Sequence, residues 1–171
     1  MFVVFHAADS GYEGDSARWG ENKLGSFNSG ALVELLATQY ERPIEESIAA
    51  MLAHGVFARH PGLRVATIEL GSKWATQLYA RARSTYAKLP QMFASDPVQT
   101  LREHLWISPF YEDNLTTLRE VIGAERIMLG SDWPHPEGLV MPGDYMDHLA
   151  GFSDADIHLV MAGNLKALLD I

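Results

Sequence analysis

Val65-Ala66-Thr67-Ile68-Glu69 is a short apolar run that ends on an acidic residue. Its length and its β-branched residues predict a buried strand rather than a helix. A helical pattern follows at Lys73–Lys88, with Trp74 and Leu78 on its inward face and Pro90 just beyond its end. A strand followed directly by a helix is the repeating unit of folds built on a parallel sheet.

The same unit recurs along the chain. Three further apolar runs predict strands, at Phe2–Phe5, Leu105–Ile107 and Ile127–Leu129. Between and after them, helical patterns predict a helix at Ala31–Tyr40, one from Pro43 towards Pro61 that is weakened at Gly55, one at Glu112–Ile122, and two short C-terminal helices that begin with the capping residues Ser153 and Asn164. The order β-α-β-α-β-α-β-α therefore predicts an α/β fold whose parallel sheet has right-handed crossovers.

The composition restricts the class of protein. The 171 residues fit one domain, residues 1–171, with 47% apolar residues and a net charge of −9 from 13 basic and 22 acidic side chains. This acidic excess argues against a nucleic-acid or anionic-membrane partner, which would need a basic patch. The absence of cysteine excludes a disulfide framework and is typical of a cytoplasmic enzyme. Neither a secretory signal nor an apolar run of about 18 residues is present, so no membrane segment is predicted.

Three of the four predicted strands end in a residue that can bind a metal or move a proton: His6, Glu69 and Asp132. Because the carboxyl ends of parallel strands converge on one face, we expect these side chains to meet. Alternation along each strand places Val4 on the face of His6 and Thr67 on the face of Glu69. Inward carboxylates and an imidazole need a partner, and a divalent metal such as zinc, iron or manganese supplies one.

Each residue also has a simpler interpretation. His6 could hydrogen-bond to a loop, Glu69 could pair with Lys73 one turn later, and Asp132 could cap the following turn. The convergence of all three favours a site over these separate roles. The other histidines except His135 are expected to be surface, capping or packing groups: His54, His60, His104, His148 and His158.

Substrate-binding residues are expected in the loop after Asp132. His135 follows in a Gly- and Pro-rich stretch on the same face, and Trp133 could form the wall of a pocket there. Trp74, shortly after Glu69, could do the same, although its helical spacing also fits core packing. The sequence contains neither a phosphate-binding glycine loop nor a dinucleotide fingerprint, and it lacks Gly-x-Ser-x-Gly, His-x-His and His-Glu-x-x-His motifs.

The ten residues Leu129–Gly138, LGSDWPHPEG, resemble the amidohydrolase-related family of metal-dependent hydrolases and decarboxylases. Within the amidohydrolase superfamily, this is the aminocarboxymuconate-semialdehyde decarboxylase-like branch. Gly55–Val65 and Glu69–Trp74 resemble the segment around the family's sixth strand. Val3–His6 resembles the end of its fifth strand, and Ala162–Leu165 the start of its last helix. The resemblance covers essentially the whole chain.

This resemblance implies a (β/α)8 TIM barrel of which the chain supplies the C-terminal half, strands five to eight. It implies that His6 and Asp132 bind a divalent metal, zinc or else manganese or iron, and that Asp132 accepts a proton from water that the metal activates. Glu69 stands where better-known members carry a histidine that assists proton transfer, and many relatives resemble this chain in having Glu there. Asp132 and Glu69 are therefore the implied catalytic residues.

These observations predict a metal-dependent hydrolase or decarboxylase that acts on a small carboxylated or cyclic carbonyl compound. One alternative is a catalytically inactive half-barrel that forms a homo-oligomer or complements a missing N-terminal half. Another is an open α/β binding domain without metal. The length of the chain bears on the choice, because a complete barrel needs about 250 residues and its first strands, including the one with His-x-His, have no counterpart here.

Overall fold

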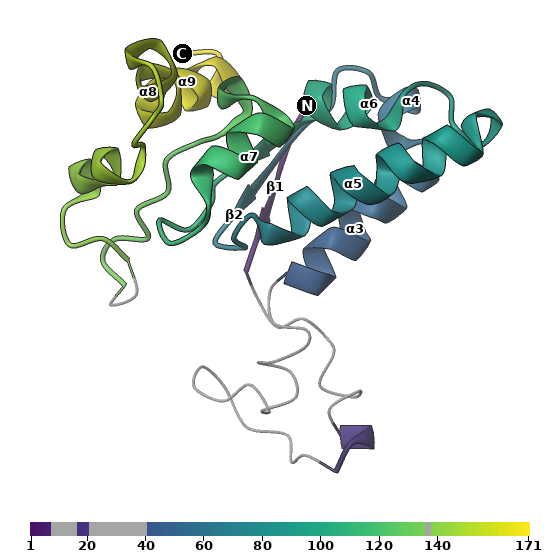
Figure 1. Ribbon diagram of the computed structural model, residues 1–171, viewed down its shortest axis with the longest axis horizontal. Helices are drawn as coiled ribbons and strands as arrows, with labels where there is room; N and C mark the ends of the chain where they lie inside the picture. Colours follow the sequence, from purple (N-terminus) through teal and green to yellow (C-terminus); the bar gives the residue numbers. More distant parts are fainter. Residues whose placement is uncertain (8–16, 21–40, 136–137) are drawn as a thin grey trace.

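The computed structural model of the chain describes residues 1–7, 17–20, 41–135 and 138–171 (Figure 1). Three parallel strands form a sheet in the order β1-β2-β3: β1 (Phe2–His6), β2 (Arg64–Ile68) and β3 (Leu105–Ile107). In register, Val3 lies opposite Val65, and Val65 lies opposite Leu105. The prediction of an α/β fold with a parallel sheet is therefore confirmed.

The fourth apolar run, Ile127–Leu129, does not form the regular strand that the sequence predicts. An isolated parallel bridge joins Ile127 to Ile107. The Met128 N–H donates to the Ile107 carbonyl at 2.8 Å, but the Leu129 N–H donates to the Val160 carbonyl at 2.9 Å. Only this one bridge joins the run to β3, and the Leu129 amide on its other side is bonded to the C-terminal helical region instead of to a further strand.

Helices occupy most of the remaining described chain. They are α3 (Glu41–Ala53), α4 (Val56–Arg59), α5 (Lys73–Lys88), α6 (Pro97–His104), α7 (Leu115–Ile122), α8 (Asp154–His158) and α9 (Asn164–Leu169), with 3-10 turns η1 (Pro90–Met92), η2 (Ala124–Arg126) and η3 (Pro142–His148) and a π turn η4 (Leu159–Gly163). Figure 1 shows α3 and α5 side by side next to the strands. The predicted helix at Ala31–Tyr40 lies outside the described residues.

The helix boundaries differ from the predicted ones for local reasons. The helix predicted from Pro43 towards Pro61 is interrupted at Gly55, where φ is 65°. The helix predicted from Glu112 begins later, because the Asn114 side chain caps it by accepting from the Thr117 N–H. Helix α6 was not predicted, although Asp96 followed by proline is a start signal: the Asp96 carboxylate accepts from two backbone N–H groups of its first turn.

The two faces of the sheet are covered unequally. Val65, Leu105 and Ile107 belong to the large core cluster that the helices α3, α5 and α7 complete. The opposite face carries a smaller cluster of Ala66, Trp106 and Met128, against which Leu168 of α9 packs. Val4 also points to that opposite face, and it is 43% exposed. This second face is therefore closed beside β3 and open beside β1.

Asn164 is not the helix cap that the sequence predicts. The chain enters α9 from the η4 turn without leaving the helical region, so no capping position exists there. Its buried side chain instead donates to the carbonyls of Ala124 and Ile127, both at 2.7 Å. These two bonds fix the C-terminal helix to the segment that leads into the Asp132 loop. The Ser153 cap is confirmed, since its hydroxyl accepts from the Asp156 N–H at 3.2 Å.

Substituting Asn164 with alanine is expected to lower the free energy of unfolding by about 2 kcal/mol, because the buried Ile127 carbonyl would lose its side-chain donor and the Ala124 carbonyl would keep only the Ile127 N–H. Urea denaturation followed by circular dichroism measures this change. Lys166→Ala, an exposed position in the same helix, serves as the control and should stay within about 0.5 kcal/mol of the original chain. Equal stability of the two variants would contradict the anchoring role of Asn164.

Candidate metal centre

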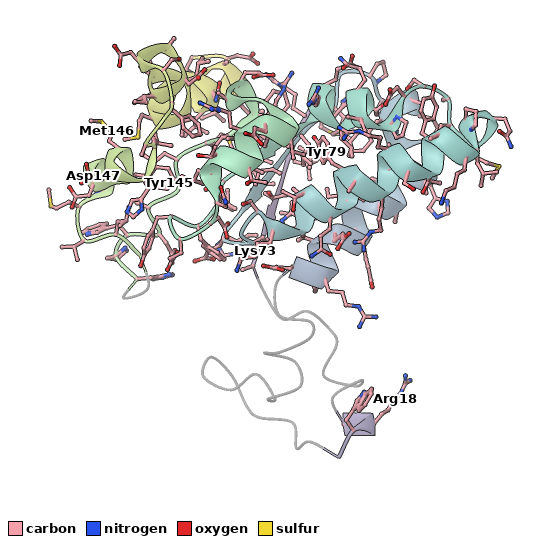
Figure 2. All side chains as sticks on the ribbon, in the orientation of Figure 1. Arg18, Lys73, Tyr79, Tyr145, Met146 and Asp147 are labelled. Atoms are coloured by element: carbon pink, nitrogen blue, oxygen red, sulfur yellow. The ribbon has the colours of Figure 1, made fainter. Side chains whose placement is uncertain are left out.

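Four side chains meet at the carboxyl end of the sheet. His6 is the last residue of β1, Glu69 follows β2 directly, and Asp132 and His135 lie in the loop after Ile127–Leu129. In Figure 1 this is the end of β1 away from the label N. It is also the end at which α5 begins, marked by Lys73 in Figure 2.

The distances among these side chains are short. His6 Nε2 lies 2.9 Å from Glu69 Oε2. His135 Nδ1 lies 3.4 Å from Glu69 Oε1 and 3.2 Å from Asp132 Oδ1. Glu69, Asp132 and His135 each offer a ligand atom, and the three atoms lie within 4.8 Å of one another. Glu69 thus pairs with the two histidines, and among the described residues no ion pair joins it to Lys73.

Both carboxylates stand on backbone with positive φ, 58° at Glu69 and 55° at Asp132. The register places Thr67 beside Ile107, on the helix-covered face. Strict alternation would have put Glu69 on that face too, away from His6, so the prediction that alternation points both side chains inward is wrong. The left-handed residue turns the chain at the end of β2 and brings the Glu69 side chain to His6.

A buried carboxylate supports the loop that carries Glu69. Asp113 accepts from the Ser72 hydroxyl at 2.9 Å and from the Phe110 N–H at 3.1 Å, which joins the loops after β2 and β3. Trp74 is 1% exposed, and its indole N–H donates to the Gly71 carbonyl at 3.0 Å. Trp74 therefore does not line a substrate pocket, one of the two roles that its position predicts, but packs in the core behind the loop, which is the other.

Backbone hydrogen bonds shape the loop that carries Asp132. The His135 N–H donates to the Asp132 carbonyl at 2.8 Å, and the Leu139 N–H donates to the Ser131 carbonyl at 2.9 Å. This tight turn explains why His135, expected to contact substrate or to shuttle protons, reaches both carboxylates. The sequence signal for this contact is the spacing of three residues between Asp132 and His135, which one turn can bring together. Trp133 is 64% exposed on the same turn.

The two carboxyl groups perturb each other. Asp132 raises the pKa of Glu69 above its ordinary value, mainly through a side-chain hydrogen bond, and burial adds to this increase. His6 and His135 act in the opposite direction on the same pKa. Like charges at this separation disfavour full ionisation, so Glu69 retains a proton more readily than an isolated glutamate.

Each ring nitrogen of His6 lies within hydrogen-bond distance of an oxygen atom. His6 Nδ1 is 2.6 Å from the Ala7 carbonyl, which only accepts, so Nδ1 carries hydrogen. The contact between Nε2 and Glu69 then needs one further proton, on either the imidazole or the carboxyl group. A cation bound to Nε2 would displace that proton.

The donor set fits a divalent metal ion. Carboxylate oxygen and imidazole nitrogen are ligands that zinc, manganese and iron accept. Catalytic zinc sites use three protein ligands and leave a position open, and this cluster offers at least that number. A cation would also offset the repulsion between the two adjacent carboxylates, which raises the pKa of Glu69.

A cavity of about 480 Å³ lies at the opposite end of the sheet, between the α3–α4 turn and α6. None of the four site residues lines it. His104 does, and its Nδ1 lies 2.6 Å from the Leu63 carbonyl while its ring stacks on Phe57 at 4.9 Å. His104, for which the sequence predicts no functional role, is thus a buried packing group. Across the described ranges, no helix has the length and apolar character needed to cross a bilayer.

Sequence comparison finds relatives with known activities. A family model described as amidohydrolase matches residues 32–171. A Dictyostelium discoideum protein named 2-amino-3-carboxymuconate-6-semialdehyde decarboxylase is 25% identical over 130 residues, which are 73% of this chain and 36% of that protein.

Solved structures give a second set of matches. The crystal structure of an amidohydrolase from Mycobacterium avium subsp. paratuberculosis is 42% identical with a TM-score of 0.86, over 97% of this chain and 41% of that one. A dihydroxybenzoic acid decarboxylase from a Polaromonas species, solved with bound manganese, is 18% identical with a TM-score of 0.60. The match covers 76% of this chain and 40% of that one. A 2,6-dihydroxybenzoate decarboxylase from Rhizobium is 17% identical with a TM-score of 0.62, and the match covers 93% of this chain and 56% of that one. These last two share the fold, and the chain spans about half or less of each of these proteins.

Proposed function

Since the chain belongs to the amidohydrolase family, we propose that it binds one divalent metal and takes part in the decarboxylation or hydrolysis of a small carboxylated or cyclic carbonyl compound. The convergence of His6, Glu69, Asp132 and His135 at the carboxyl end of the sheet carries this proposal. The decarboxylases among the similar proteins favour the first reaction, and the family description favours the second.

His6 and Asp132 are the proposed metal ligands, and Glu69 or His135 would provide the third. The bound metal would supply Lewis acidity, polarising a substrate carboxylate or carbonyl oxygen and acidifying water. Zinc is the first candidate for the ion, and manganese is supported by the Polaromonas decarboxylase with bound manganese. The exposed Trp133 and His135 would contact the substrate from the same loop.

Glu69 and Asp132 would have different roles in proton transfer. Glu69, whose pKa is raised, would hold a proton and deliver it to the substrate carbon as the bond to the departing carboxylate breaks. In hydrolysis, Asp132 would accept the proton of the attacking water, and Glu69 would protonate the leaving group. Two carboxyl groups whose environments differ in this way are a frequent arrangement of acid and base catalysts.

The decisive experiment measures metal content and then turnover. The purified chain is analysed by inductively coupled plasma mass spectrometry and assayed for CO2 release from 2,6-dihydroxybenzoate and for hydrolysis of cyclic amides. Stoichiometric metal with turnover supports the proposal. Metal without turnover of either substrate class supports the alternative of an inactive half-barrel, and failure to bind either Zn²⁺ or Mn²⁺ contradicts the metal site itself.

Metal binding is expected to release protons and to weaken as the pH falls. The raised pKa of Glu69 means that its proton is retained to a higher pH than usual, and the proton between His6 and Glu69 must also leave. Isothermal titration with Zn²⁺ in two buffers of different ionisation enthalpy measures this release. A His6→Ala variant should release fewer protons, and an enthalpy independent of the buffer would contradict the assignment.

A further inference from the structure

The cavity at the amino end of the sheet has the size of a small-molecule site. Its volume of about 480 Å³ falls within the range of roughly 300–1,000 Å³ that is typical of such sites. Its walls come from three segments: residues 52–61 at the α3–α4 turn, residues 92–95 at the end of η1, and one face of α6. Helices α4 and α6 mark this end of the molecule in Figure 1. The candidate metal centre contributes no residue to it.

His104 of α6 has one ring nitrogen without a partner. The side chain is buried, with the residue 7% exposed. Its Nδ1 contacts the Leu63 carbonyl, which only accepts, so Nδ1 carries hydrogen and Nε2 is an acceptor in the neutral imidazole. In the part of the chain that the structure describes, nothing donates to Nε2, yet protein atoms do not fully enclose it. Because His104 lines the cavity, that is where Nε2 would find a donor.

The imidazole ring is held in a fixed orientation. Its face stacks on Phe57, which is 2% exposed, with the ring planes 30° apart. The contact between Nδ1 and the Leu63 carbonyl, 2.6 Å long, holds the edge of the ring. Two contacts of different kinds thus set the direction of Nε2. An acceptor fixed in advance costs little further ordering when a ligand binds to it.

The wall opposite α6 carries side chains that pack well against an aromatic ring. Phe93 lines the cavity, and the ring of Tyr86 meets it edge-to-face at 5.7 Å. Met92 lines the cavity as well and is 73% exposed. Aromatic rings and thioethers both interact favourably with aromatic groups. A planar aromatic ligand would therefore cover apolar surface that is now open to water.

The remaining polar groups restrict the charge of a ligand. The Thr100 hydroxyl donates to the Asp96 carbonyl at 3.0 Å and lies 2.9 Å from the Ser95 hydroxyl, so these two hydroxyls already have partners. Glu103 lines the cavity and accepts from the Gln99 amide, whereas the lining contains neither lysine nor arginine. A carboxylate next to an acceptor nitrogen disfavours an anion and favours a neutral donor.

We propose that this cavity is a second binding site, which takes a neutral, planar aromatic compound with one N–H or O–H group. That group donates to Nε2 of His104, and the aromatic ring packs against the wall that carries Met92 and Phe93. Water alone would satisfy Nε2 but would leave this wall uncovered. The site is separate from the candidate metal centre and needs no metal.

Isothermal titration of the complete 171-residue chain with indole and with benzofuran tests the proposal. The two probes have the same shape, but benzofuran has an oxygen atom where indole has its N–H. We expect indole to bind with one site per chain and benzofuran to bind at least about fivefold more weakly, because a buried acceptor would then lack its donor.

Nitrogen NMR of the original chain locates the bound probe. The resonance of an acceptor imidazole nitrogen shifts when it receives a hydrogen bond, so indole should shift Nε2 of His104 and benzofuran should not. His104→Asn retains a donor near the position of Nδ1 but removes Nε2, and it should lose at least about fivefold in affinity for indole. His158→Asn makes the same change at an exposed residue of α8 outside the cavity and should bind indole as the original chain does.

Four results would overturn the proposal: no binding of indole up to its solubility limit, equal affinity for benzofuran, an unshifted Nε2 resonance of His104, or a folded His104→Asn variant with unchanged affinity. If His104→Asn does not fold, the NMR shift in the original chain decides the question. All of these measurements are made without metal or turnover, so their outcome is independent of the proposed function.

Discussion

Substitution of Asp132 with asparagine is expected to weaken Zn²⁺ or Mn²⁺ binding by about 100-fold or more, while the free energy of unfolding changes by about 1 kcal/mol or less. Loss of partners that merely orient a ligand already costs 10–100-fold in affinity, so loss of a charged ligand should cost at least as much. Asparagine accepts the positive φ of this position as aspartate does. The pKa of Glu69 should also fall towards its ordinary value, because Asp132 is the main cause of its increase.

Isothermal titration of the metal-free protein measures the affinity. The control is Asp144→Asn, which makes the same charge change at an exposed residue of the η3 turn. This control separates loss of a ligand from loss of overall negative charge. If Asp132→Asn binds metal as tightly as Asp144→Asn does, Asp132 is not a ligand and the proposed centre is wrong.

Substitution of Gly138 with alanine is expected to reduce metal affinity by about tenfold or more and to lower the free energy of unfolding by about 1–3 kcal/mol. A Cβ atom at Gly138 would lie 2.5 Å from the carbonyl oxygen of Ser131 and 2.8 Å from the carbonyl carbon of Asp132. Both are backbone atoms of the loop that carries the carboxylate ligand. Relief of this clash therefore displaces Asp132 and His135 from Glu69.

Gly143→Ala is the matched control, since a Cβ there meets no atom within 4 Å. Titration with Zn²⁺ and chemical denaturation of both variants give the two effects. A Gly138→Ala protein with the affinity of Gly143→Ala would show that the Ser131–Asp132 backbone is free to shift without disturbing the site.

The sheet could be predicted from the sequence largely because its strands are short apolar runs bounded by helices and loops. The run Ile127–Leu129 has the same composition, yet it forms a single bridge to β3. Its outer side is bonded not to a strand but to the Val160 carbonyl, which lies some thirty positions later along the chain. Local patterns do not contain such a contact. Asn164 was misjudged for the same reason, because its partners Ala124 and Ile127 are distant in sequence.

The sequence predicts which side chains meet at the carboxyl end of the sheet, but not how the backbone directs them there. The convergence of parallel strand ends brings His6, Glu69 and Asp132 together as expected. Alternation within β2, however, would have pointed Glu69 towards the helices. A single left-handed residue overrides a two-residue period, and nothing in the sequence marks a glutamate for that conformation.

The positive φ values at Glu69 and Asp132 lower the stability of the fold at the residues that form the candidate site. A glutamate in the left-handed region costs about 1 kcal/mol relative to glycine, and the protein bears this cost where it also brings two carboxylates together. Stability alone would select glycine or asparagine at position 69. The glutamate found there is explained by its carboxylate, which contacts both His6 and His135.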